Sequence, residues 1–169
     1  MHESSDIPDL EIHTDVWRRL MVVLAQEHEE LQLLKLHLFT EQLLHQMLAT
    51  YLRASEKEIG RLRLGYARKV DFVEVAHLVG KDGCSLLRKL NRLRQKLAHE
   101  LNYTITTEER KSLTEGIAQN LDRELLGGSV FRRLAPFLGG YLSGGMKLSK
   151  LVAQKIGDIR PEDIQQPPK

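Results

Sequence analysis

Two residues that could act on a phosphate lie five positions apart in this sequence, Arg94 and His99. A guanidinium group matches the geometry of a phosphate and stabilises negative charge that develops on it. An imidazole gains and loses a proton near neutral pH, which suits a general base or acid. RNA supplies its own nucleophile, the 2′-hydroxyl, so this pair has the groups needed to cut RNA without a metal ion.

The segment that carries the pair, residues 86–99, reads LLRKLNRLRQKLAH. Its leucines recur at helical spacing and predict one apolar stripe, made of Leu86, Leu90, Leu93 and Leu97. At about 100° per residue, Arg94 falls about 40° from Leu90 and therefore inside the apolar face. A charge there is costly unless a partner neutralises it, so we interpret Arg94 as a functional residue.

A long helix predicted over residues 27–53 is apolar on most of its circumference, which is typical of a helix at the centre of a bundle or at a dimer interface. Glu41 lies on this helix near the face of Leu44. We predict that Glu41 pairs with Arg94, within or between subunits, and orients the guanidinium group. The alternative is that Glu41 is solvated at the edge of the bundle. Lone histidines such as His37 are expected to be core or edge residues.

The Arg-x4-His spacing, the polar residue after the arginine and the leucine-rich helix before it resemble the HEPN superfamily over residues 30–103. The phrase LNRLRQKLAHEL is also similar to the mannitol-repressor-like and solo HEPN-like bacterial branches. This resemblance implies an all-helical, usually dimeric protein. In many members, the same arginine and histidine form a metal-independent RNA endonuclease site. Gln95 stands where the family commonly has asparagine, and the nearest downstream tyrosine is Tyr103.

The resemblance implies that Arg94 and His99 are catalytic and that no metal or other cofactor is used. We assign a supporting or phosphate-contacting role to Gln95, Glu41, Arg92 and Tyr103. Residues five apart on a regular helix point about 140° apart. We therefore expect a composite active site in a two-fold homodimer, where two copies of the motif face one groove. On the structural alternative, His99 only places a favourable cation at a helix end.

Two functions from different classes remain open. The first is a HEPN-like endoribonuclease, acting as a toxin or phage-defence component, with RNA as substrate and an antitoxin as protein partner. The second is a non-catalytic helical regulator of the mannitol-repressor-like type, which binds a protein partner or nucleic acid. The presence of both Arg94 and His99 favours the first.

The distribution of charge is uneven although the net charge is only +2. Residues 61–99 hold ten basic residues against three acidic ones, which indicates a surface attractive to RNA or, alternatively, a solvated helix face. Cys84 is the only cysteine, so neither an internal disulfide nor a cysteine-based zinc site is expected. The acidic N-terminus lacks the apolar core of a signal peptide, and no apolar run reaches the roughly 18 residues of a membrane span. We therefore expect a cytoplasmic protein without stable membrane insertion.

The pattern predicts an all-α bundle of five to seven helices and no strand. We expect a disordered acidic tail over residues 1–13, a single helical domain over residues 14–157 and a C-terminal tail over residues 158–169. A helix is expected near residues 62–79, ended by the glycines at 80 and 83, and another begins at Thr106 or Thr107.

The glycine-rich stretch at residues 127–145 has no assigned role. Met146 occupies the place of the lysine in a phosphate-binding loop, which argues against that motif. The stretch instead predicts a helix near residues 130–138, a flexible connection and a short helix over residues 146–156.

Overall fold

The computed structural model describes residues 18–25, 28–115 and 129–158, and all regular secondary structure in them is helical. Residues 18–25 are helical, and six helices follow: α2 (Glu29–Tyr51), α3 (Glu56–Arg61), α4 (Tyr66–Val75), α5 (Lys81–His99), α6 (Thr107–Thr114) and α7 (Val130–Asp158). The all-α bundle of five to seven helices is thereby confirmed. The predicted acidic tail and all but the first residue of the predicted C-terminal tail lie outside the described residues.

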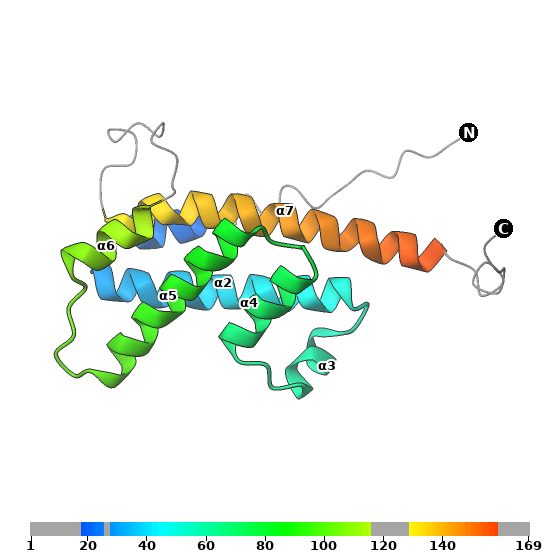
Figure 1. Cartoon of the computed structure of the whole chain (residues 1–169), viewed down its shortest axis with the longest axis horizontal. Helices are drawn as coiled ribbons and strands as arrows, with labels where there is room; N and C mark the ends of the chain where they lie inside the picture. Colours follow the sequence, from blue (N-terminus) through cyan, green and yellow to red (C-terminus); the bar gives the residue numbers. More distant parts are fainter. Residues whose placement is uncertain (1–17, 26–27, 116–128, 159–169) are drawn as a thin grey trace.

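Helix α2 is the centre of the bundle, as its apolar circumference predicts, and contacts α3, α4, α5 and α7. Helices α2 and α7 lie side by side and run in the same direction (Figure 1). Two side-chain hydrogen bonds agree with this parallel arrangement. Ser129 bonds to Gln32 at the N-terminal ends, and Thr50 bonds to Met146 further along. Helix α5 crosses this pair obliquely, and its last turns extend past α2 (Figure 1).

Helix α7 corrects the prediction of two short helices joined by a flexible connection, since one helix runs through the glycines and through Pro136. Its buried side chains continue at intervals of four residues across the glycine-rich part: Leu134, Leu138, Leu142 and Met146. Gly145 also has a packing role, because a Cβ there would lie 2.7 Å from the Leu78 carbonyl oxygen and from Met47 Cε. Close packing against α2 therefore offsets the low helix propensity of glycine.

A helix lies within the range expected near residues 62–79, but it is shorter than predicted and the glycines at 80 and 83 do not end it. The chain forms α3, which begins with a reciprocal capping box between Ser55 and Glu58, and then the separate helix α4. Gly80 does not end a helix but is the N-cap of α5. Gly83 lies inside α5, where a Cβ would meet Tyr141 Cγ of α7 at 2.8 Å. The missing side chain thus allows α5 to approach α7.

Three non-glycine residues have a positive φ angle, Arg53, Arg63 and His77, whereas Gly80 has a φ of −66°. Arg53 and His77 follow α2 and α4 in Schellman motifs, in which Ala54 N–H donates to the Ala49 carbonyl and Leu78 N–H to the Val73 carbonyl, each at 2.9 Å. Thr106 is the N-cap of α6 in a capping box with Glu109, which confirms the first of the two predicted starts. In the described part of the chain, no helix combines the length and apolar character needed to cross a membrane.

Candidate functional site

A polar pocket of about 370 Å³ opens where α5 extends past α2 and approaches the start of α4. We call it the arginine pocket. Three elements line it. Helix α2 supplies His37 and Glu41, and α5 supplies Asn91, Arg94 and Gln95. The rest of the lining comes from the turn before α4 and its first residues: Arg63, Gly65, Tyr66, Ala67 and Arg68.

Arg94 lines this pocket and is exposed, so the prediction that it lies within the apolar face is wrong. The angle around the helix was correct, since Leu90 one turn earlier is fully buried. Arg94 nevertheless avoids burial because its side of α5 faces the open arginine pocket between α2 and the start of α4. Arg94 makes no hydrogen bond or ion pair with any residue that the structure describes.

Glu41 pairs with Lys69 and not with Arg94 of the same chain, which corrects the predicted partner. Lys69 Nζ lies 2.9 Å from Glu41 Oε1, and only 10% of the lysine side chain is exposed. A half-buried carboxylate does need a cation, as the sequence argument assumed, but α4 supplies the cation. Glu41 still lines the arginine pocket, with its charge compensated there by Lys69.

His37 is the residue of this pocket that the sequence argument set aside. Its Nε2 lies 3.0 Å from Asn91 Oδ1, and its ring stacks on Tyr66 with centroids 4.1 Å apart. Burial lowers the pKa of His37 below 6.5, and nearby Arg94 and Lys69 contribute in the same direction. The ring is therefore mostly neutral at pH 7 and able to accept a proton. The four-residue interval from His37 to Glu41 on α2 was the available signal, because it places both on one face.

Two further arginines were also missed. Arg63 has a φ of 49° in the turn after α3, and Arg68 lies in the first turn of α4. Neither forms an ion pair within the described residues. Among the described residues that line the pocket, these two and Arg94 are three arginines, against one carboxylate, that of Glu41. The N-terminus of α4, which has no side-chain cap, adds further positive potential.

The other predicted site residues divide between the pocket and its surroundings. Gln95 lines the pocket beside Arg94. His99, the last residue of α5, and Arg92 are exposed and do not line it. Tyr103 is turned toward α6, where its hydroxyl donates to Glu109 Oε2 at 2.5 Å. One chain therefore brings together Arg94, Gln95 and Glu41, but not His99.

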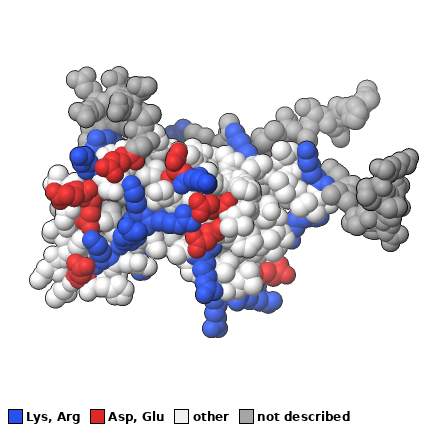
Figure 2. All heavy atoms as spheres, in the orientation of Figure 1, with Lys and Arg blue, Asp and Glu red and all other residues white. Residues whose placement is uncertain are grey.

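Half of the six lysine and arginine residues on α5 are held by partners in the fold. Arg88 donates to Asp71 and Glu74, both at 2.6 Å, and Lys96 donates to Glu109 at 2.7 Å. Lys89 donates to the Ser112 carbonyl at 2.6 Å. Basic and acidic side chains accordingly alternate over α4, α5 and α6 on the face seen in Figure 2. The excess of basic residues in the sequence thus does not form one continuous basic surface on this face.

Comparison with protein-family models, with curated proteins and with solved structures gives no significant match to this chain. The resemblance to the HEPN superfamily therefore rests on the residues quoted above. Across the described residues, no three histidine, cysteine, aspartate or glutamate side chains come together as ligands for a metal ion. The chemistry that the arginine pocket supports best is the binding of an anion such as a phosphate.

Proposed function

We propose that this protein is a HEPN-like endoribonuclease that acts without a metal ion, and that the arginine pocket binds the phosphate at which RNA is cut. One observation carries the proposal: Arg94 faces an open pocket with two other arginines and has no partner among the described residues. Unpaired arginines that converge on one pocket are suited to bidentate phosphate contacts. Intracellular RNA as the substrate implies a cytoplasmic location.

In the proposed reaction the 2′-oxygen of RNA attacks the adjacent phosphorus, and the bond from phosphorus to the 5′-oxygen breaks. The 2′-hydroxyl proton passes to a base, and the 5′-oxygen leaves with a proton from an acid. The products are a 2′,3′-cyclic phosphate and a 5′-hydroxyl end. Arg94 balances the charge that accumulates on the phosphorane oxygens, and Gln95 donates a hydrogen bond to one of them.

The proposed proton carrier is His99, and it requires a second copy of the chain. His99 is exposed at the end of α5 and does not line the pocket of its own chain. A two-fold homodimer would bring His99 of the second copy toward the pocket that contains Arg94. The neutral ring of His37 beside Arg94 is the alternative base within one chain.

Cleavage of RNA by the purified protein in the presence of EDTA tests this proposal. We expect Arg94→Gln to reduce the cleavage rate by about 100- to 1000-fold, as for loss of one donor to a developing oxyanion. His99→Gln should reduce it by about 100-fold or more through loss of general acid–base catalysis. His28→Gln, at an exposed position outside the pocket, is the matched control and should cleave normally. Cleavage that persists in His99→Gln but fails in His37→Gln would identify His37, rather than His99, as the general base.

A second function is favoured by the position of His99 outside the pocket. On this proposal the protein binds a phosphate-bearing ligand or a protein partner and regulates without cutting RNA. RNA that is bound but remains intact at every protein concentration would favour the regulator. Overexpression that arrests growth, with the arrest abolished by Arg94→Gln, would favour the nuclease and an antitoxin as its partner.

A further inference from the structure

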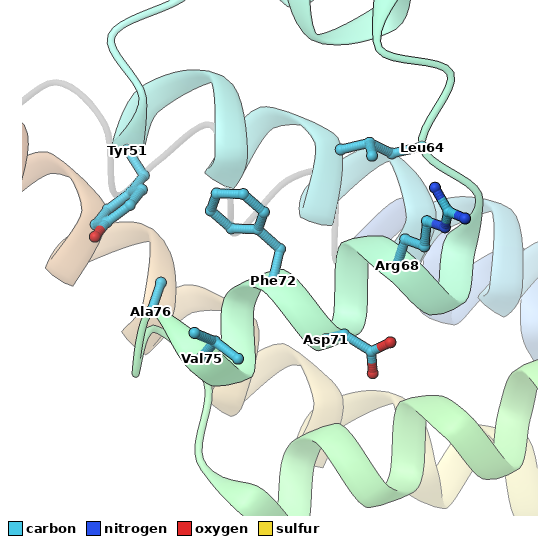
Figure 3. A pocket seen from close by; sticks show the side chains of 7 residues that line it. All are labelled: Tyr51, Leu64, Arg68, Asp71, Phe72, Val75 and Ala76. Carbon is cyan, nitrogen blue, oxygen red and sulfur yellow. The ribbon is translucent and has the colours of Figure 1, made fainter.

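A second pocket, of about 530 Å³, lies on the outer side of α4 and differs in character from the first. We call it the apolar pocket. Its lining is Tyr51, Leu64, Arg68, Asp71, Phe72, Val75 and Ala76. Figure 3 shows Phe72 pointing from α4 into the space between Tyr51 and Leu64. Phe72 is 38% exposed and Val75 80% exposed, so part of the apolar wall is open to water.

Arg68 lines both pockets. Helix α4 leads from one to the other, with Gly65 and Tyr66 at the arginine pocket and Phe72 in the apolar pocket. Arg68 and Phe72 are four residues apart, so they lie on one face of α4 and about 6 Å apart along its axis. A ligand that places a charge against Arg68 can therefore place an adjoining group against the ring of Phe72.

The charges around the apolar pocket favour an anionic rather than a cationic ligand. Among the described residues of its lining, Asp71 is the only carboxylate, and Arg88 Nη2 donates to Asp71 Oδ1 at 2.6 Å. Arg68 has no ion pair with any described residue. The ligand that fits has a negative group at Arg68 and a flat apolar group beside Phe72.

We infer that the apolar pocket receives the base of a nucleotide adjoining the phosphate held in the arginine pocket, so the ligand is single-stranded RNA. This inference rests on the proposed binding of RNA. Stacking of a base on an aromatic side chain is available to every base and needs no sequence-specific hydrogen bonds. Bases inside a duplex are stacked on each other and cannot enter such a pocket, whereas the bases of single strands and loops can.

Binding of two non-cleavable oligonucleotides tests the inference. The first is a fluorescently labelled 2′-O-methyl RNA hexamer, which has no free 2′-hydroxyl, and the second is an abasic hexamer with the same number of phosphates. We expect the full-length protein to bind the base-containing oligomer about five- to 150-fold more tightly, as for stacking of one base. Phe72→Ala should remove most of this ratio while binding of the abasic oligomer stays unchanged.

Two further variants keep the result interpretable. Phe72→Leu retains an apolar side chain without a π-face. It should therefore bind the two oligomers with similar affinity but keep the thermal stability of the wild type. Leu101→Ala changes a fully exposed leucine elsewhere and should retain the ratio. If the wild type binds the two oligomers with equal affinity, or if the affinity ratio is unchanged in Phe72→Ala, the inference is overturned. Either result would leave the proposed phosphate site uncontradicted. If neither oligomer binds, the proposed function itself fails.

The competing occupant of the apolar pocket is a second copy of this chain. Sedimentation of the wild type and of Val75→Asp distinguishes it. If Val75→Asp converts a dimer into a monomer, the pocket is a subunit interface and the inference is overturned. An unchanged oligomeric state, together with loss of the base-dependent ratio in Phe72→Ala, supports the inference.

Discussion

The two ends of α5 are built from similar residues but used differently. At its first half, Gly83 packs against Tyr141 of α7, and Arg88 is held between Asp71 and Glu74 of α4. In its second half, Arg94 and Gln95 face an open pocket, and Arg94 has no partner among the described residues. The first half fixes the helix in the bundle, and the second half is available to a ligand.

This difference shows that a count of basic residues does not distinguish structural cations from binding cations. Arg88 and Arg94 occur within seven residues of each other, in the same leucine-rich helix. The distinction comes from what lies opposite each of them, namely two carboxylates of α4 for Arg88 and a solvent-open pocket for Arg94. Variants of the two ends should therefore separate effects on binding from effects on folding.

The largest expected effect is on RNA affinity, in the pair Arg94→Gln and Arg88→Gln. For a non-cleavable single strand, Arg94→Gln should weaken binding about tenfold or more through loss of a charge-assisted hydrogen bond. It should also reduce the slope of log K against log salt by about 0.7, as for loss of one phosphate contact. Arg88→Gln should lower the affinity less, because it removes no phosphate contact and only leaves the charge of Asp71 uncompensated. It should leave the salt slope unchanged and cause a modest loss of thermal stability. An equal loss of affinity in the two variants would refute the division of α5 into two functional ends.

The next largest effect is on the stability of the fold, for a substitution in the first half of α5, which packs against α7. Gly83→Leu places a side chain where even a Cβ would lie 2.8 Å from Tyr141 Cγ. We expect the free energy of unfolding, measured by urea denaturation, to fall by about 1–3 kcal/mol through overpacking. Gly80→Ser is the matched control, because Gly80 is an N-cap with open space around its Cα and serine is a favoured N-cap residue. It should leave the stability unchanged or slightly raised.

The smallest effect concerns the attachment of the open half to α6. Burial alone would raise the pKa of Glu109, but hydrogen bonds from Lys96, Tyr103 and the Thr106 backbone lower it from 4.5 to about 2. A carboxyl group with a lowered pKa stabilises the fold above its unfolded pKa, and this contribution is lost as the pH falls through the folded pKa.

Wild type should therefore exceed Glu109→Gln in stability by about 1–2 kcal/mol at pH 6, after allowance for screening by solvent. The difference should shrink between about pH 4.5 and pH 2. Urea denaturation of both proteins at several pH values in this range measures it. A difference that does not depend on pH would mean that the carboxylate charge of Glu109 is not what holds α6 to α5.

The sequence was sufficient for the features that depend on neighbouring residues. Helical periodicity identified the central helix, observed as α2, and the leucine-rich helix, observed as α5. The local capping pattern predicted that α6 starts at Thr106 or Thr107, and the structure has Thr106 as its N-cap. These predictions held because a hydrophobic repeat or a capping box involves residues within one or two turns of each other.

Tertiary structure decided the features that depend on distant elements. The angle of Arg94 around its helix follows from the sequence, but the arrangement of α2, α4 and α5 determines that this side faces an open pocket. In the same way, Lys69 rather than Arg94 became the partner of Glu41. Helix α7 continues through its glycines because its buried side chains pack along α2. Helical spacing specifies the direction in which a side chain points from its helix. The packing of that helix against the others determines whether the side chain contacts a partner residue, the core or solvent.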